Sequence, residues 1–221
     1  MFFTESWLSS NISDAMISID GYTLIRSDRS YSQGGGVVLF YKNGLKIKLI
    51  DVDYCSFGLE LNNFEFLCID YFEDNSSIRF LCVYLPPRFA LCTVTVQTLC
   101  KLVDKVSNSM VPCYIIGDFN LPKIDWKFNT STGGLSHNIF LQFCVNNGWN
   151  QLISTSTHVK QNILDLLLCN YLGKKHLQSF SVNSPLTTKC DHNTISLKFL
   201  NETPNTSSST FNLPDFRRAD F

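Results

Sequence analysis

The sequence of 221 residues lacks several features that would assign it to a protein class at once. No apolar run approaches the ~20 residues needed to cross a bilayer, so we expect no membrane partner. No C-x-x-C pair occurs, which excludes the usual zinc-knuckle spacing. The 18 Lys and Arg residues are balanced by 19 Asp and Glu residues, which gives a net charge of -1. This balance excludes a polycationic packaging protein, but not an enzyme that contacts nucleic acid through a local basic strip.

The amino terminus also lacks the basic residues and the apolar core of a secretory signal. Nine cysteines are present, an odd number, and most of them stand inside apolar runs such as 66–69 and 81–83. Cysteines in such runs are typical of reduced thiols in the core of an intracellular protein. We therefore expect a protein of the nucleus, the cytoplasm or both, and not a secreted one.

The composition indicates one folded domain. Hydrophobic residues make up 44% of the chain and charged residues 17%, which is enough to form a core. After Leu200 the sequence becomes polar, and residues 201–210 have the composition of a linker. We predict a single domain over residues 1–200, followed over residues 201–221 by this linker and the start of a connector.

Short apolar runs bounded by turn residues predict strands through much of the chain. Asn43-Gly44 separates two such runs and predicts a hairpin turn between them. Helix-like spacing of apolar residues predicts helices over 91–106 and 135–144, the second ending near Gly148. Strands interspersed with two helices favour a layered α/β sandwich over a regular βαβ alternation. The predicted strands cover 36–42, 45–50, 64–72, 78–85, 111–116, 163–168 and 194–200.

The segment Gly117-Asp118-Phe119-Asn120 follows a predicted buried strand. In an extended chain the side chains of Asp118 and Asn120 share one face. A carboxylate beside an amide suits a Mg²⁺ site or the orientation of an attacking water. The alternative is an Asx turn that ends the strand.

Two other polar segments stand near the last predicted strands. Asp191-His192 can supply a general acid or base, or a cation for developing negative charge, and the alternative is an ordinary loop. Asp165 interrupts an apolar strand, and a buried carboxylate needs a partner, for which a histidine is the natural choice. The alternative is an exposed position on an edge strand.

Further residues are less informative by themselves. Glu5 is typical of the first turn of a helix, and Tyr84, at a strand end before two prolines, is typical of a structural residue. Gly34-Gly35-Gly36 lacks the Lys-Ser/Thr of a phosphate-binding loop and is interpreted as a flexible entry to a strand. Three histidines without ligand-like spacing are left out of the site, namely His137, His158 and His176.

Taken in order, these segments resemble the endonuclease/exonuclease/phosphatase superfamily, in particular the endonuclease domain of non-LTR (LINE-type) retrotransposon polyproteins. The resemblance covers nearly the whole chain, and residues 216–221 resemble the connector to the reverse transcriptase. The matching motifs are Thr-Glu-Ser-Trp-Leu (4–8), Gly34-Gly35-Gly36-Val37, Tyr84 with Pro86-Pro87, Gly-Asp-Phe-Asn (117–120), Thr157-His158, Ile163-Leu164-Asp165 and Asp191-His192.

The resemblance implies a fold and an activity. The fold is a DNase I-like, two-layered β-sandwich flanked by helices. The activity is Mg²⁺-dependent nicking of DNA, with Mn²⁺ as the other candidate ion, and it leaves a 3′-hydroxyl that primes reverse transcription. DNA is then the substrate, and a covalently attached reverse transcriptase domain is the partner. The alternatives are an inactive truncated remnant, or a phosphatase of the same superfamily that acts on inositol phosphates.

The sequence departs from the family pattern at two points. The family begins with one more strand, which carries an Asn of the metal and phosphate site, whereas Met1 stands where that strand should already be finished. We therefore expect the first strand to be missing. Cys190 replaces the usual Ser before the Asp-His pair, and a thiol is a weaker hydrogen-bonding group than a hydroxyl.

The resemblance also implies roles for single residues. Glu5 is the principal metal ligand, and Asp191 assists the metal or the leaving group. Asp118 activates or orients the attacking water, and Asn120 beside it holds the phosphate or the water. These roles match the demands of phosphodiester hydrolysis, which needs charge neutralisation and an in-line water.

The remaining roles concern the transition state and the DNA. His192, oriented by Asp165, stabilises the charge of the transition state, and Tyr84 donates a hydrogen bond to a phosphate oxygen. Basic residues in loops around the site are expected to neutralise DNA phosphates. The basic residues singled out are Arg29, Arg88 and Lys123.

Overall fold

The computed structural model describes residues 1–52, 63–73, 76–107 and 110–200. The predicted linker and connector over residues 201–221, and Cys55, lie outside the described residues. In the part of the chain that is described, none of the helices combines the length and the apolar character needed to span a bilayer.

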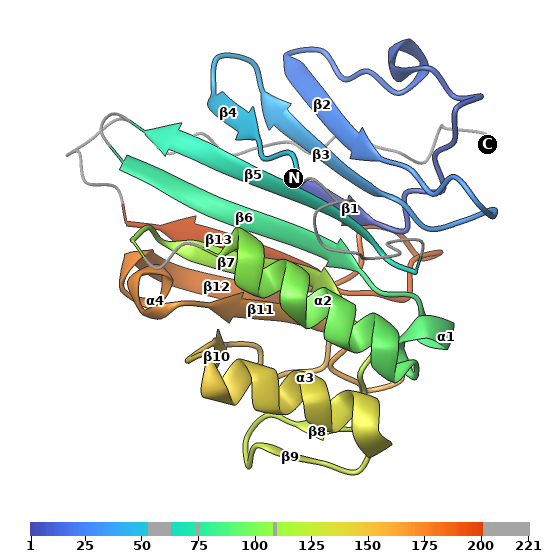
Figure 1. The fold of residues 1–221 in the computed structure, drawn as a ribbon. Helices are drawn as coiled ribbons and strands as arrows, with labels where there is room; N and C mark the ends of the chain where they lie inside the picture. The colour runs from blue at the N-terminus through green and yellow to red at the C-terminus, as the bar shows by residue number, and fades with distance from the viewer. Residues whose placement is uncertain (53–62, 74–75, 108–109, 201–221) are drawn as a thin grey trace.

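A six-stranded sheet forms the centre of the molecule (Figure 1). Its strands follow the order β10 (Asn150–Gln151), β11 (Asp165–Cys169), β7 (Cys113–Asp118), β6 (Ser76–Tyr84), β5 (Glu65–Glu73) and β4 (Lys46–Leu49). Neighbouring strands are antiparallel except β6 and β7, which run parallel because a helical connection joins them.

Two smaller sheets cover one face of the central sheet. One has the order β1 (Phe2–Thr4), β3 (Val37–Lys42) and β2 (Tyr22–Ser27), and the other pairs β12 (Leu177–Asn183) with β13 (Thr194–Phe199). Both reach Phe80 of the central sheet, whose ring centroid lies 6.2 Å from that of Phe2 and 5.7 Å from that of Phe199. The expected β-sandwich is therefore confirmed.

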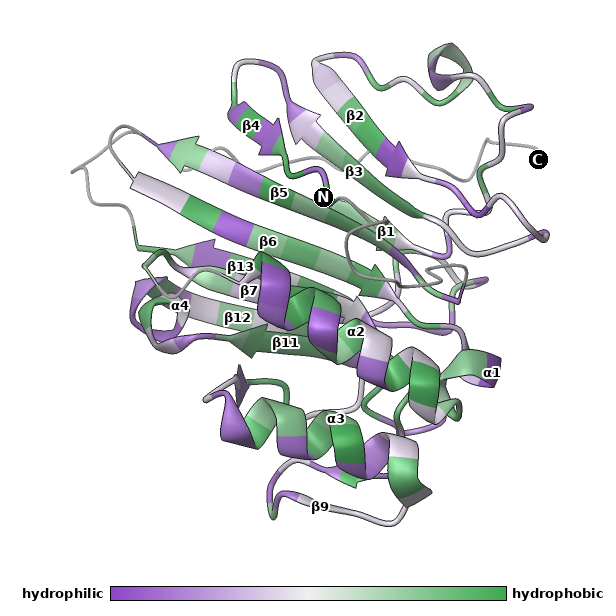
Figure 2. Cartoon of the chain, viewed as in Figure 1, coloured by the Kyte–Doolittle hydropathy of each residue, from purple (hydrophilic) through white to green (hydrophobic). Residues whose placement is uncertain are grey.

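Helices cover the opposite face of the central sheet, as Figure 1 shows. Leu81 and Val83 of β6 pack against these helices, whereas Phe80 and Cys82 face the small sheets. Both faces of β6 are buried from Phe80 onward, which explains the apolar run 80–83. Figure 2 shows the same pattern in β11, which is coloured as hydrophobic.

The remaining elements are η1 (Asp14–Met16), α1 (Pro87–Ala90), α2 (Thr93–Val106), β8 (Ile124–Asp125), β9 (Thr130–Ser131), α3 (Gly134–Asn146) and α4 (Tyr171–His176).

The predicted hairpin at Asn43-Gly44 is wrong, although the turn itself exists. The backbone N–H of Leu45 donates to the carbonyl oxygen of Lys42 at 3.2 Å, and Gly44 has a φ of +90°. The strands on either side belong to different sheets, because β3 is already paired with β1 and β2 on its two edges. The turn therefore carries the chain from one layer of the sandwich to the other.

The other predicted strands and both predicted helices are confirmed, with their boundaries within two residues of the prediction. Six strands of the described chain were not predicted, namely β1, β2, β8, β9, β10 and β12. Among the described residues β1 pairs only with β3, so its other edge has no strand beside it.

Gly117 permits the close approach of β6 and β7 at the end of the central sheet. Its φ is +125°, and a Cβ at this position would lie 2.0 Å from the carbonyl oxygen of Val83. Only glycine fits such a position, because backbone atoms of a central strand cannot move aside.

We predict that Gly117→Ala lowers the free energy of unfolding by about 3 kcal/mol or more, since backbone strain and overpacking add. Gly44→Ala is the matched control, because Gly44 has a φ of +90° and open space around it. The control is expected to lose only about 1–2 kcal/mol. Urea denaturation measures the free energy of unfolding of both variants. An equal loss in Gly117→Ala and Gly44→Ala would show that the close approach of Gly117 to Val83 is unimportant.

Candidate active site

Three polar side chains form a row across the central sheet. Tyr84 of β6 is the register partner of Asp118 of β7, which in turn pairs with Asp165 of β11. Register partners on adjacent strands point to the same face of a sheet. Tyr84 belongs to the core beneath the small sheets, so the whole row faces them. All three side chains are buried.

The opposite layer of the sandwich supplies two more residues. Glu5 directly follows β1 and accepts a hydrogen bond from the hydroxyl of Tyr84. His192 precedes β13 and donates from Nδ1 to Oδ2 of Asp165 at 2.8 Å. The site therefore joins both layers of the fold. Glu5 does not begin a helix, since its φ is +52° and an irregular segment follows it.

The segment after β7 makes the Asx turn that was considered as an alternative. The backbone N–H of Asn120 donates to Oδ1 of Asp118 at 3.1 Å, and its side-chain Nδ2 donates to Oδ2 at 2.8 Å. The same Nδ2 donates to the carbonyl oxygen of Leu85 at 3.0 Å. The turn and a site role are compatible, because the turn fixes the carboxylate of Asp118 within the row.

The charges of the site are unbalanced. Burial raises the pKa of Asp118 well above its usual range, and the neighbouring carboxylates of Asp165 and Glu5 add to the effect, whereas His192 opposes it. The hydrogen bond to Asp165 raises the pKa of His192 to about 9. A divalent cation would relieve the crowding of the carboxylates, and carboxylate oxygens are the ligands that Mg²⁺ and Mn²⁺ prefer.

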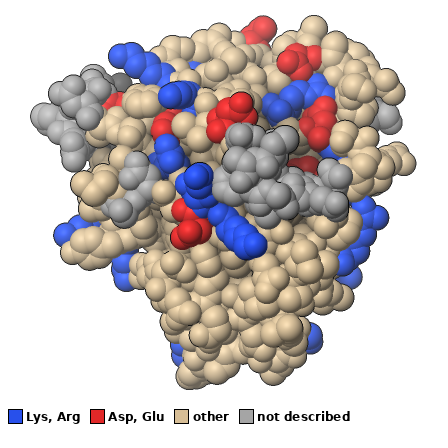
Figure 3. All heavy atoms as spheres, in the orientation of Figure 1, with Lys and Arg blue, Asp and Glu red and all other residues tan. Residues whose placement is uncertain are grey.

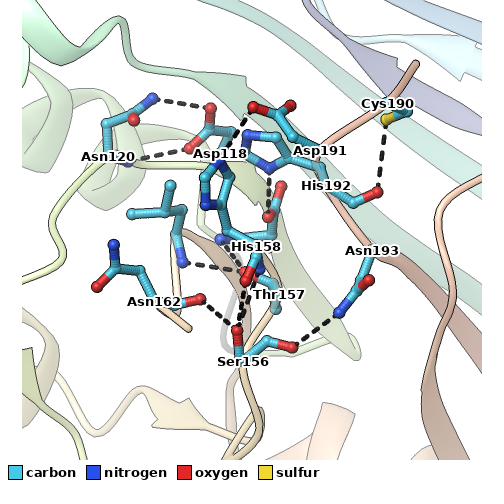
Figure 4. A network of polar contacts seen from close by, with 12 residues as sticks. Asp118, Asn120, Ser156, Thr157, His158, Asn162, Cys190, Asp191, His192 and Asn193 are labelled. Carbon is cyan, nitrogen blue, oxygen red and sulfur yellow. Dashed lines mark hydrogen bonds and ion pairs between the residues drawn. The ribbon is translucent and has the colours of Figure 1, made fainter. Parts of the chain in front are cut away.

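His158 belongs to this cluster, although its spacing in the sequence gave no reason to include it (Figure 4). Ligand atoms of His158, Asp191 and His192 lie within 4.8 Å of one another. Nδ1 of His158 accepts the backbone N–H of Lys160 at 3.1 Å, so its proton lies on Nε2, which donates to Oδ2 of Asp191 at 3.1 Å. In this tautomer His158 orients the Asp191 carboxylate and has no lone pair to offer a metal there.

The segment that contains His158 connects the two layers. The hydroxyl of Thr157 accepts the backbone N–H groups of Leu164 and Asp165, both at 3.0 Å. Its carbonyl oxygen accepts the N–H of Asn193 at 2.7 Å. The start of β11 is thereby fixed to the start of β13, and Asp165 to His192. The motif Thr157-His158 was the one signal of this connection in the sequence.

The predicted DNA contacts require one correction. Arg29 is only 7% exposed, and its Nε donates to Oε1 of Glu65 at 2.6 Å in a buried ion pair. Its charge is therefore neutralised inside the protein and does not face solvent. Arg88 and Lys123 are exposed, as predicted. On the face drawn in Figure 3, basic and acidic side chains are interspersed.

Cys190 lies beside the site and is exposed. Its thiol donates to the carbonyl oxygen of His192, with sulfur and oxygen 3.4 Å apart. The loop has further connections, because the backbone N–H of Val159 donates to the carbonyl oxygen of Asp191 at 2.9 Å. The loop around Asp191 is thus held by several bonds besides the weak one from the thiol.

The β-sandwich with flanking helices is the fold expected for the endonuclease/exonuclease/phosphatase superfamily. The sequence model of the endonuclease-reverse transcriptase family matches residues 78–196, more than half of the chain. The chain therefore belongs to this family of nuclease-like hydrolases. No curated protein matches the chain.

Solved structures share the fold at low sequence identity. The endonuclease domain of TRAS1, a telomere-specific non-LTR retrotransposon, matches with a TM-score of 0.62 and 13% identity over 84% of this chain and 83% of its own. The 3′ phosphatase NExo from Neisseria, bound to a product DNA hairpin, has a TM-score of 0.61 and 13% identity, over 90% and 87%. An AP endonuclease from Archaeoglobus fulgidus has a TM-score of 0.61 and 12% identity over the same shares.

We predict that Asp165→Asn lowers the pKa of His192 from about 9 towards 6.5, because the charged hydrogen-bond acceptor is lost. The ion pair stabilises the fold fully below pH 6.5, and this contribution is lost as the pH rises through about 9. Ring NMR titration measures the pKa, and thermal melts follow the stability. Asp104→Asn, an exposed carboxylate on α2, is the control and should leave both unchanged. An unchanged His192 pKa in Asp165→Asn would contradict the assignment.

Proposed function

We propose that this chain is a Mg²⁺-dependent endonuclease domain that nicks DNA. The nick leaves a 3′-hydroxyl, which primes a covalently attached reverse transcriptase domain. The observation that carries the proposal is the pairing of a buried carboxylate, Asp118, with the His192–Asp165 ion pair in the same cluster. Membership of the endonuclease-reverse transcriptase family supports the same conclusion.

Asp118 and His192 have complementary protonation states for phosphodiester hydrolysis. Because the pKa of Asp118 is raised, its carboxylate is a stronger base for a water proton. Because the pKa of His192 lies at about 9, its imidazole carries a positive charge at neutral pH. It is therefore suited to stabilise a developing negative charge or to donate a proton to the leaving oxygen.

The other residues position these groups. Asn120 holds the Asp118 carboxylate through two hydrogen bonds, and Asp165 fixes the ring of His192. The hydroxyl proton of Tyr84 is directed at Glu5, so we propose that Tyr84 orients this ligand in addition to its expected contact with a phosphate oxygen. Each of these contacts reduces the reorganisation that the reaction would otherwise require.

Glu5 and Asp191 are the residues that would hold the metal. Both carboxylates are exposed, and Asp191 is fixed by His158. When bound, Mg²⁺ neutralises phosphate charge and polarises the phosphorus–oxygen bond that breaks. Mn²⁺ has similar ligand preferences and is expected to substitute for it. Arg88 and Lys123 remain the proposed contacts to DNA phosphates.

We predict that the chain nicks supercoiled plasmid in Mg²⁺, and that Asp118→Ala and His192→Ala each lower the rate by about 100-fold or more. Gel assays of relaxed plasmid measure the rate, and Asp104→Asn is the control with unchanged activity. Nicking that survives both alanine substitutions would disprove the residue assignment. Release of phosphate from inositol phosphates, without nicking, would favour the phosphatase alternative.

We also predict that Mg²⁺ raises the melting temperature and that EDTA reverses the effect, because an ion that binds only the folded state stabilises it. The gain is about 2.7 kcal/mol when the ion is at a hundred times its Kd. Glu5→Gln should abolish the shift. Glu73→Gln, an exposed carboxylate at the opposite end of β5 from the site, should retain it. A wild-type melt that does not respond to Mg²⁺ would favour the inactive remnant.

A further inference from the structure

Trp7 is an exposed aromatic side chain next to the proposed metal ligand Glu5. Its side chain is 59% exposed, although an indole is among the side chains that gain most from burial. Only one residue separates it from Glu5, so the two Cα atoms are about 7 Å apart at most.

The backbone of this segment is strained. Glu5 and Trp7 both adopt a left-handed conformation, with φ values of +52° and +56°. Such conformations cost about 1–2 kcal/mol each in residues other than glycine and persist only where the surroundings enforce them. Here the backbone N–H groups of Ser6 and Trp7 donate to the carbonyl oxygens of Gly36 and Gly35, at 3.2 Å and 2.8 Å. These two hydrogen bonds hold the backbone that carries Trp7 against the glycine segment.

The three glycines shape this arrangement and are more than a flexible entry to β3. All have positive φ values, of +83°, +73° and +87° for Gly34, Gly35 and Gly36. A Cβ on Gly34 would lie 3.5 Å from the indole of Trp7, and a Cβ on Gly35 would lie 2.4 Å from the guanidinium of Arg29. The glycine segment thus leaves room for the indole of Trp7 at Gly34 and for the guanidinium of Arg29 at Gly35.

A second exposed ring lies close to the same cation. The guanidinium carbon of Arg29 is 5.3 Å from the ring centroid of Tyr31 and 5.6 Å from that of Tyr84. Tyr31 is 41% exposed. Arg88 is exposed, and its guanidinium carbon lies 4.5 Å from the ring centroid of Phe89. It follows Tyr84 by only four residues, so it stands at the same end of β6 as this cluster.

We propose that Trp7 and Tyr31 form a stacking platform for bases of unpaired DNA beside the scissile phosphate, and that Arg88 binds the adjoining backbone phosphate. The proposal rests on the proposed nuclease function. Aromatic side chains bind bases of single strands by stacking, whatever the sequence, and a nearby cation neutralises the phosphate. The backbone hydrogen bonds of Trp7 and the position of its indole beside Gly34 restrict the ring in advance, which lowers the cost of ordering it on binding.

Binding of a fluorescein-labelled oligothymidine strand, measured by anisotropy in EDTA, tests the platform apart from catalysis. Trp7→Ala should weaken binding about 5- to 150-fold without changing the salt dependence, because stacking involves no ions. Trp7→Phe should retain most of the affinity. Arg88→Ala should lower the slope of log affinity against log salt by about 0.7. Phe128→Ala is the control, because Phe128 is 67% exposed and lies in the turn between β8 and β9, two strands that contact α3.

Two results would overturn the platform, provided that thermal melts show folded variants. One is wild-type affinity in Trp7→Ala, and the other is an equal loss in Trp7→Phe and Trp7→Ala. Plasmid nicking is scored separately in Mg²⁺. If the protein nicks plasmid but its binding to the strand does not depend on Trp7, the proposed function holds and the platform is wrong. If its binding depends on Trp7 but it does not nick plasmid, the platform holds and the proposed function is wrong.

Discussion

The register of β6, β7 and β11 is the constraint on which the site depends. It places Tyr84, Asp118 and Asp165 side by side on one face of the central sheet. Because side chains alternate between faces along a strand, a slip of one residue would turn Asp118 towards the helices and away from His192. Gly117 contributes to this register, since it lets the strands approach where any larger residue would separate them.

The burial of Asp118 and Asp165 explains the electrostatics of the site. Two carboxylates side by side beneath a second layer of strands are costly unless cations offset them. His192 supplies one positive charge through its hydrogen bond to Asp165. The exposed carboxylates of Glu5 and Asp191 add further negative charge at the same end of the sandwich. A bound cation would offset the negative charge that His192 leaves uncompensated.

The sequence predicted those elements whose burial leaves a local pattern. β6 and β11 have both faces buried and therefore show continuous apolar runs, whereas β12 is mostly exposed and was not recognised. The order of motifs predicted a set of site residues, and the structure brings Glu5, Tyr84, Asp118, Asp165 and His192 together. His158 and Arg29 were misjudged because their surroundings depend on Asp191 and Glu65, residues far away in the chain. A dipeptide such as Asn43-Gly44 likewise determines a turn but not the partner of the strand that follows.

The site takes its residues from both ends of the described chain, from Glu5 to His192. Such a site has a very high contact order, and the loops that it closes are among the longest that the domain can form. Any folding intermediate that lacks either small sheet has the central carboxylates but no histidine, or no Glu5, to complete them. Assembly of the site is therefore coupled to completion of the whole sandwich, and a partly folded chain has only part of the site.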